Sequence, residues 1–459
     1  MPGLVWLRRD LRRRDLPLLA EAAASDGSAA VVFVLDDRWA RLSTARRAWL
    51  ARNLLSLRAS YEERLCLRFG DPAIVIGQVA SEVAAACVHV SNESEPDGAM
   101  RDAAVRAALA ELGVALVATG SPYAVTPGRL RSSSGGGFKV FTPFSRAWRE
   151  HGWREPAQEP STLRLLDVAS DECAWAMVRD AASAPGLPDM PAAGEQAALE
   201  RWDQFLAEGL ETYDSTRDRP DLDGTSRMSP YLALGVVHPR TLLADLAGND
   251  GPGVQRFITE LAWREFYADV LAQFPDSLHH DLRPELAGLA YDDDPGELDA
   301  WQHGRTGYPI VDAGMRQLLA TGWMHNRLRM LVAMFLSKNL LIDWRAGEHF
   351  FMGQLIDGDL AANNGGWQWS ASTGTDAVPY FRLFNPISQS RRFDPDGRFI
   401  RHWLPELAHL DNRAIHEPTA LGGLFGAPDY PRPLVDLAAS RERALAAFRD
   451  LPSRETDHE

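Results

Sequence analysis

The densest group of polar and aromatic side chains in the sequence is the stretch DGDLAANNGGWQW, residues 357–369. Acids, amides and indoles follow one another here with few apolar residues between them. Asn363 and Trp367 are four residues apart, so they share a face if the segment is helical. Gly365 and Gly366 remove side chains where a flat molecule could lie against the backbone. The stretch therefore indicates a ligand site, against the alternative of a glycine-rich turn between two core helices.

The composition is that of a soluble globular protein. The 459 residues allow two or three domains or one large double one, with 45% hydrophobic and 24% charged residues. No apolar run reaches the length of a membrane span, and the N-terminus is not a secretory signal. The three cysteines, Cys66, Cys87 and Cys173, have no CxxC spacing. We therefore expect a cytoplasmic protein without disulfides, structural zinc or another metal site.

The net charge of −15 disfavours nucleic-acid binding if it is taken alone. A protein with a negative net charge can still have a local patch of positive charge, however, and arginines cluster in two parts of the sequence. One group is Arg382, Arg391, Arg392, Arg398 and Arg401, and the other is Arg8, Arg9, Arg12, Arg13 and Arg14. The alternative for each group is a solvated surface.

Short β-branched runs alternate with helix formers over residues 1–130. We predict strands at 4–7, 30–35, 74–76, 88–90 and 114–117, and helices at 16–24, 46–64, 78–86 and 99–112. This alternation predicts a doubly wound, Rossmann-like α/β domain with a parallel sheet. No GxGxxG follows the first strand, so the usual dinucleotide fingerprint is absent.

The remaining sequence changes character twice. Residues 131–194 hold a serine- and glycine-rich loop, a helix that begins near 141, and a long stretch rich in Pro, Ala, Ser and Asp, which we interpret as an interdomain connector. Residues 195–459 are mainly helical, with a last amphipathic helix at 434–450. We therefore predict a second, larger, all-α domain.

Three further motifs combine groups that suit a polar, planar ligand. Tyr213 precedes TSRMS, residues 225–229, whose hydroxyls and backbone N–H groups at a helix start suit a phosphate. The alternative is a plain helix N-cap. Glu260, Trp263, Arg264 and Tyr267 recur at helical spacing and line one face. A surface ion pair between Glu260 and Arg264 is the alternative there.

In the third motif, Asn326, Arg329 and Met330 share a helical face. A buried arginine needs a carboxylate partner, and Asp357 is the candidate. Met330 could equally be ordinary core packing.

These segments, together with WQHGRTGYPIVD at 301–312, resemble in order the DNA photolyase and cryptochrome family, nearest to the bacterial class I cyclobutane pyrimidine dimer photolyases. The resemblance implies an α/β domain followed by a helical domain that binds FAD non-covalently. It assigns these residues to the cofactor: Tyr213, Thr225, Ser226, Arg227, Met228, Ser229, Arg264, Arg329, Asp357, Gly358, Asp359 and Asn363.

The resemblance also implies light-dependent DNA repair, a carbon–carbon lyase activity, in which excited reduced FAD lends one electron to the dimer. Asn363 is the family position that faces flavin N5, and a neutral amide favours the reduced anion that repair requires. Enzymes for (6-4) photoproducts carry His at the positions of Asn326 and Met330, because their chemistry needs proton transfer. By resemblance, Glu260 and Asn326 bind the dimer, and Trp263 and Trp369 pack on it.

The partner implied is ultraviolet-damaged DNA, single- or double-stranded, bound by a monomer. Photolyases are a standard example of base flipping, so the expectation that the dimer leaves the duplex rests on the family resemblance. The residues assigned to DNA are Arg217, Glu260, Trp263, Asn326, Arg327, Arg382, Gln389 and Arg392. Phosphate contacts carry no base information, so binding should weaken with salt.

The family often re-reduces its flavin through three tryptophans. Trp367 and Trp344 align with the first two, and the third position falls on Tyr291. A tyrosine must lose its proton as it is oxidised, so we expect slower or less stable photoreduction.

Two questions stay open at this point. Folate-using members carry an Asn-Glu pair after the fourth strand, where this chain has Pro96-Asp97-Gly98, so the antenna is folate, a deazaflavin or none. The competing functions are a cryptochrome-type blue-light photoreceptor, a (6-4) photolyase and an electron-transfer flavoprotein. Asn363 and the missing long C-terminal tail disfavour the photoreceptor, and the arginines of 382–401 disfavour the flavoprotein.

Overall fold

The chain folds into two units. The structure, a computed structural model, describes residues 1–24, 27–160, 162–377, 379–420 and 427–451. Unit 1 comprises Met1–Glu211 and Ser226–Pro275, and unit 2 comprises Thr212–Thr225 and Asp276–Glu459. The domain boundaries at 130 and 194 remain predictions from the sequence.

Unit 1 is built on a parallel sheet. Its strands are β1 (Gly3–Leu7), β2 (Ser28–Leu35), β3 (Leu65–Phe69), β4 (Cys87–Val90) and β5 (Ala115–Ala118), in the order β3-β2-β1-β4-β5, with β6 (Arg164–Leu165) paired to β2. Every residue of β1 and β2 is buried, as expected for strands covered on both faces. The predicted doubly wound α/β fold is confirmed.

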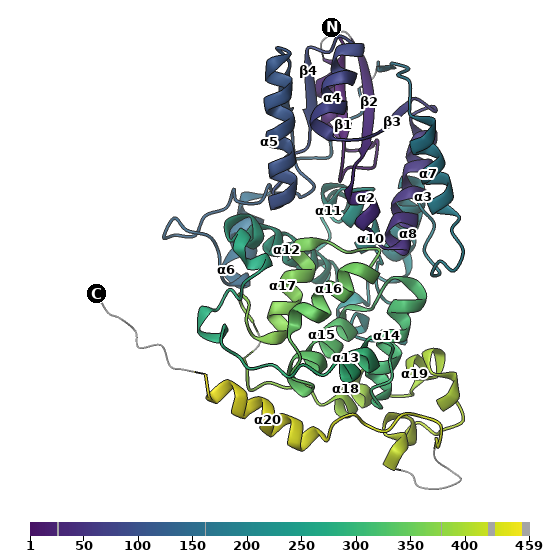
Figure 1. Cartoon of the computed structure of the whole chain (residues 1–459), viewed down its shortest axis with the longest axis vertical. Helices are drawn as coiled ribbons and strands as arrows, with labels where there is room; N and C mark the ends of the chain where they lie inside the picture. The colour runs from purple at the N-terminus through teal and green to yellow at the C-terminus, as the bar shows by residue number, and fades with distance from the viewer. Residues whose placement is uncertain (25–26, 161, 378, 421–426, 452–459) are drawn as a thin grey trace. The chain divides into compact units, whose positions relative to one another are not determined.

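Helices flank this sheet on both sides. They are α1 (Pro17–Ala23), α2 (Arg38–Arg41), α3 (Thr44–Ser60), α4 (Pro72–Glu82), α5 (Pro96–Glu111) and α7 (Glu172–Ala182). Figure 1 shows α4 beside α5 on one side of the strands and α3 beside α7 on the other, and both pairs are in contact. The buried Trp175 of α7 lies in the stretch that the sequence indicated only as a surface connector.

One predicted strand is wrong. Residues 74–76 lie in α4, because Asp71 accepts a hydrogen bond from the Ala73 N–H at 2.9 Å and Pro72 starts the helix at its first position. The missing strand is β3, which begins at Leu65, a short turn after α3 ends at Ser60. A short apolar run cannot be assigned to helix or strand by periodicity alone, so the two errors have the same cause.

The other helices of unit 1 are α6 (Phe141–His151), α8 (Glu195–Glu208), α10 (Ser229–Leu234), α11 (Pro239–Asp245) and α12 (Pro252–Gln273). Glu265 connects α12 to its surroundings. Its buried carboxylate accepts hydrogen bonds from Trp148 Nε1 at 2.6 Å, from Val125 N at 3.0 Å and from Ala124 N. Burial raises the pKa of Glu265 to about 7, although the three donors favour the charged form.

The regular elements of unit 2 are all helices in the residues that the structure describes. Its helices are α9 (Tyr213–Thr216), α13 (Pro295–Gln302), α14 (Pro309–Thr321), α15 (Asn326–Met334), α16 (Trp344–Gln354), α17 (Leu360–Ala371), α18 (Pro386–Phe393), α19 (Arg398–Trp403) and α20 (Leu437–Arg449). They enclose one apolar core that includes Trp301, Trp344 and Trp367. The predicted all-α character of this region is confirmed.

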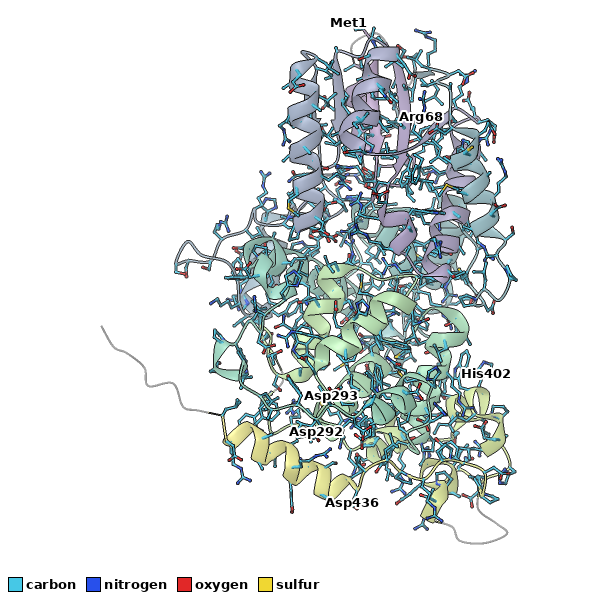
Figure 2. All side chains as sticks on the ribbon, viewed as in Figure 1. Met1, Arg68, Asp292, Asp293, His402 and Asp436 are labelled. Atoms are coloured by element: carbon cyan, nitrogen blue, oxygen red, sulfur yellow. The ribbon has the colours of Figure 1, made fainter. Side chains whose placement is uncertain are left out.

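The last helix is fixed at its start and along its length. Asp436, labelled in Figure 2, caps α20 by accepting from the N–H groups of Ala438 and Ala439. Arg443 forms an ion pair with Asp292 at 3.0 Å and donates to the carbonyl of Asn339 at 2.9 Å. None of the described helices is long and apolar enough to cross a membrane.

Candidate functional site

An ion pair between a half-buried arginine and a buried aspartate joins α15 to the segment before α17. Arg329 Nη2 donates to Asp357 Oδ2 at 2.6 Å, and Arg329 Nε donates to the carbonyl of Met324 at 2.8 Å. The pairing expected from the sequence is confirmed. The Asp357 side chain is 1% exposed, yet its Oδ1 has no hydrogen-bond partner among the described residues. A buried carboxylate oxygen needs a donor, so this atom marks a place for one from a ligand.

Helix α17 places Asn363 beside a second acid. Asp359 caps the helix by accepting from the Ala362 N–H at 3.0 Å. One turn later, Asn363 Nδ2 donates to Glu348 Oε1 at 3.0 Å and to the Glu348 carbonyl at 3.1 Å. The amide oxygen of Asn363 is therefore the group that remains for a ligand. Burial raises the pKa of Glu348, a residue that the sequence analysis did not select.

Two tryptophans of the expected electron path lie in the same core. Trp367 makes edge contacts with the rings of Trp301 and Phe351, with centroids 5.9 and 5.1 Å away. A Cβ at Gly347 would lie 2.1 Å from Trp367 Cη2, so the indole rests directly on α16 one turn beyond Trp344. Tyr291 packs against this core, and its hydroxyl has no hydrogen-bond partner in the part of the chain that the structure describes.

The start of α15 presents groups that do not exchange protons. Asn326 is exposed at the first position, and Met330 is half-buried one turn later. The preceding His325 caps the helix, with its Nδ1 accepting from the Arg327 N–H at 3.2 Å. Burial lowers the pKa of His325 to about 4, so the imidazole is neutral at physiological pH. The site around Asn326 therefore offers no acidic proton from this helix.

Three arginines assigned to DNA are brought together, and we call Arg217, Arg327 and Arg392 the arginine strip. Asp218 contacts Arg327 Nη2 at 2.7 Å and Arg217 Nε at 3.7 Å. The guanidinium groups of Arg327 and Arg392 lie 4.6 and 5.0 Å from the ring centroid of Phe393. Gln389, also assigned to DNA, is on the same helix as Arg392. Residues far apart in sequence thus lie together around Asp218 and Phe393.

Arg382 is held in place through its backbone. Lys338 lies in the π-helical turn Phe335–Asn339 and is 0% exposed. Its Nζ donates to Ser372 Oγ at 2.8 Å and to the carbonyls of Arg382 and Tyr380 at 3.1 and 3.4 Å. Burial lowers the pKa of Lys338 to about 7. The sequence analysis missed this residue, because its contacts are with a segment more than thirty residues away.

In unit 1, the four residues predicted to share one helical face, 260, 263, 264 and 267, all lie on helix α12. Trp263 stacks on Phe141 with ring centroids 3.7 Å apart, so one face of the indole is occupied by the phenyl ring. Arg264 donates to the carbonyls of Pro122 and Leu232 at 3.3 and 3.2 Å and lies 4.4 Å from the Tyr123 ring centroid. Glu260 is half-buried on the same helix.

The residues assigned to a phosphate lie around the start of α10. Arg227 has a positive φ of 55°, and Ser226 Oγ accepts from the Met228 N–H at 3.3 Å. Met228, rather than a hydroxyl residue, occupies the N-cap, and Ser229 begins the helix. In unit 2, Tyr213 is buried, while Thr225, Gly358 and Trp369 are half-buried. Their roles stay predictions.

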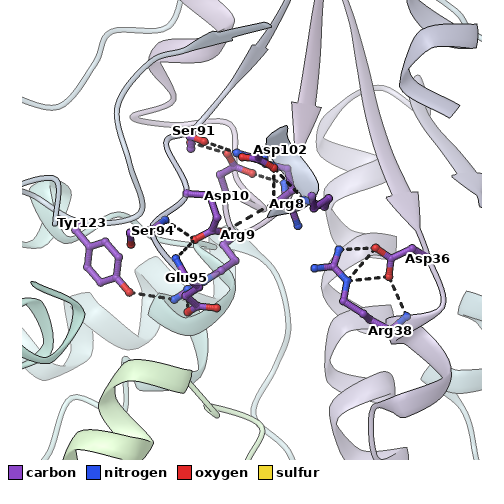
Figure 3. Close-up of polar contacts among 12 residues, drawn as sticks. Arg8, Arg9, Asp10, Asp36, Arg38, Ser91, Ser94, Glu95, Asp102 and Tyr123 are labelled. Carbon is purple, nitrogen blue, oxygen red and sulfur yellow. Dashed lines mark hydrogen bonds and ion pairs between the residues drawn. The ribbon is translucent and has the colours of Figure 1, made fainter. Parts of the chain in front are cut away.

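The carboxyl ends of β1 and β4 are where a doubly wound sheet usually binds a ligand. Here the loops are joined by their own polar groups (Figure 3). Arg8 pairs with Asp102 at 2.6 Å, Ser91 Oγ donates to Asp10 at 2.7 Å, and Arg9 pairs with Glu95. Arg12 is only 2% exposed, so the N-terminal arginine group is not simply a solvated surface.

Comparison with known proteins decides the family. Residues 257–450 match the FAD binding domain of DNA photolyase, and residues 3–161 match the DNA photolyase domain. The chain belongs to the DNA photolyase family. The deoxyribodipyrimidine photo-lyase of Halobacterium salinarum is 40% identical over 97% of this chain and 98% of its own length. The enzyme of the same name from Escherichia coli is 39% identical over 97% of this chain and 98% of its own.

Solved structures agree with this membership. A class III photolyase from Agrobacterium tumefaciens superimposes with a TM-score of 0.90 at 35% identity, covering 98% of this chain and 97% of its own. A cryptochrome from Synechocystis superimposes with a TM-score of 0.87 at 29% identity, covering 97% of this chain and 99% of its own. The photolyase fold expected from the sequence is confirmed, and the family's FAD-binding domain includes the Arg329–Asp357 pair.

Proposed function

We propose that this protein is a deoxyribodipyrimidine photolyase, which binds FAD and uses light to split cyclobutane pyrimidine dimers in DNA. The observation that carries this function is near-full-length similarity, about 40% identical, to enzymes of that name. The side chains at Asn326, Met330 and Asn363 are those of a repair site without acidic protons. We further propose that it acts as a monomer in the cytoplasm on single- and double-stranded DNA.

The residues of unit 2 fit a flavin. Asp357 Oδ1 is buried and lacks a donor, and a flavin ring carries N–H groups that can supply one. Arg329 orients that carboxylate through the bond from its Nη2 to Oδ2. The amide oxygen of Asn363 and the capping residue Asp359 would complete the contacts to the ring and sugar. When bound and reduced to its anion, FAD supplies the electron that splits the dimer.

The protein's own side chains decide which lesion is repaired. Splitting a cyclobutane dimer requires an electron and no net proton, whereas (6-4) repair requires proton transfer. Asn326 and Met330 do not titrate, and the neighbouring His325 is neutral because burial lowers its pKa to about 4. Glu260 and Asn326 would hydrogen-bond the dimer, with Trp263 and Trp369 packing on it.

DNA binding is tested by a gel shift with irradiated and intact oligothymidine. We expect tighter binding of the irradiated strand and affinity that falls steeply with salt, because the arginine strip contacts phosphates. Arg392→Ala should weaken binding to both strands and lower the salt slope by about 1. Equal and weak binding of both strands at all salt concentrations would favour the electron-transfer flavoprotein instead.

Lys338→Met is expected to weaken DNA binding while leaving FAD bound. Methionine keeps the length and apolar stem of lysine but donates nothing to the carbonyls of Tyr380 and Arg382. Losing these hydrogen bonds should reduce affinity for irradiated DNA about tenfold. Fluorescence anisotropy measures this loss, and unchanged affinity would show that Lys338 does not position Arg382.

One contact bears on whether the antenna chromophore is a folate. The segment Pro96-Asp97-Gly98 lies in the region where folate-using members of the family carry an Asn-Glu pair, and a Cβ at Gly98 would lie 2.2 Å from Glu93 Cγ. Glu93 therefore fills the space that a side chain at 98 would need. We propose that the folate contact of the family is not formed here, which leaves a deazaflavin or no antenna.

A further inference from the structure

Trp344 is hydrogen-bonded to a carboxylate. Its Nε1 donates to Asp281 Oδ1 at 2.9 Å, and the Asp281 side chain is 5% exposed. Arg345 Nη2 donates to the same oxygen at 3.0 Å. The Arg345 guanidinium carbon also lies 4.6 Å from the Trp344 ring centroid. The indole thus has an anion at its N–H and a cation over its face.

We propose that Asp281 is the proton acceptor in photoreduction, which takes the Nε1 proton of Trp344 after Trp344 has been oxidised. The inference rests on the proposed function, because it concerns how the flavin of that site is re-reduced. Trp344 gives one electron to the oxidised Trp367. The Nε1–H bond then breaks, an O–H bond forms on Asp281, and a neutral Trp344 radical remains. A thiol in solution later returns one electron to Trp344, Asp281 returns its proton to Nε1, the thiol's own proton passes to water, and two of the resulting thiyl radicals join as a disulfide.

Electron exchange between the two indoles is favoured by their packing. Trp344 begins α16, and Trp367 rests on Gly347 of the same helix one turn later. Both rings are buried in one apolar core, where little reorganisation of solvent accompanies the transfer.

The charges around Trp344 favour loss of its proton once the ring is oxidised. Oxidation makes an indole N–H far more acidic. The positive guanidinium of Arg345 destabilises the radical cation, and the carboxylate of Asp281 already accepts the hydrogen bond along which the proton moves. Deprotonation prevents the electron from simply returning to Trp344, so the flavin stays reduced long enough for a thiol to act.

Tyr291 lacks this arrangement. Its hydroxyl is buried without a hydrogen-bond partner among the described residues, and burial raises its pKa. Oxidation of tyrosine requires a group that takes the phenolic proton. The structure therefore assigns the long-lived radical to Trp344. This is one step before Tyr291, the third position of the electron path expected from the family resemblance.

The test is flash photolysis of the FAD-loaded, oxidised protein with a thiol present, in H2O and in D2O. The wild-type protein should convert a tryptophan radical cation into the neutral radical, more slowly in D2O. In Asp281→Asn this conversion should slow by about tenfold or more, and the yield of stably reduced flavin should fall. Asp281→Glu, which keeps a carboxylate, should restore part of the rate.

Asp343→Asn is the matched control. Asp343 contacts Arg345 Nη1 at 3.2 Å but is not the acceptor of the Trp344 N–H, so its loss should leave the conversion unchanged. Conversion and isotope effect in Asp281→Asn equal to those of the wild type would overturn the proposal. Dithionite reduces flavin without the tryptophans. Dimer repair by the dithionite-reduced wild type therefore tests the proposed function separately from this inference.

Discussion

Asp357→Asn is expected to strip FAD from the protein. The substitution removes the charge that pairs with Arg329 at 2.6 Å, and it replaces one carboxylate oxygen by an NH2 group. Neutralising one partner of a fully buried pair costs about 3–5 kcal/mol, and the cost here should be smaller because the Arg329 side chain is 27% exposed. Part of that cost falls on the ligand-bound state, so the Kd for FAD should rise roughly tenfold or more. The flavin-to-protein absorbance ratio after gel filtration measures the loss.

Asp299→Asn is the matched control. Asp299 also pairs with an arginine, Arg305, but its side chain is 54% exposed. An exposed pair contributes about 0–1 kcal/mol, so this variant should retain its FAD. Full FAD content in Asp357→Asn would show that the carboxylate is not part of the cofactor site.

Glu265→Ala is expected to destabilise unit 1 more than any surface change. The carboxylate accepts from Trp148 Nε1 and from the N–H groups of Ala124 and Val125. Alanine leaves these donors buried without an acceptor, at about 1–3 kcal/mol each, and opens a cavity as well. We expect a loss of about 3–5 kcal/mol in the free energy of unfolding, measured by urea denaturation.

Two further variants provide an intermediate and a minimal loss in the free energy of unfolding for comparison. Glu265→Gln keeps the shape and one acceptor oxygen, so its loss should be intermediate. Glu150→Ala on α6 removes an exposed acid and should change stability by less than about 0.5 kcal/mol. Wild-type stability in Glu265→Ala would mean that the segment around 124 is held by other contacts.

The sequence predicted the parts of the fold that depend on local pattern. The strands β1, β2, β4 and β5 were found because each is an apolar run between helix formers. Residues 74–76 were assigned wrongly because their helix is set by the cap at Asp71 and Pro72, not by their own side chains. The helix α7 was missed, since its burial depends on packing against α3.

In the candidate site too, some contacts could be predicted from the sequence and others depend on the tertiary fold. The Arg329–Asp357 pair followed from a buried arginine that needed a carboxylate, and the helical face of α12 followed from spacing. Asp281, Lys338 and Glu348 were missed, although each contacts a residue that had been selected or its backbone. Their partners are brought close only by the tertiary fold, and no spacing in the sequence indicates such contacts.

Light-driven repair by the reduced protein tests the central claim most directly. The purified protein is reduced with dithionite, mixed with ultraviolet-damaged oligothymidine, and illuminated with blue light while thymine absorbance is followed. We predict recovery of absorbance in the light, none in a dark sample, and none with Asp357→Asn. Absence of recovery in the light, with the flavin confirmed as bound and reduced, would contradict the assignment of this chain as a dimer-splitting photolyase.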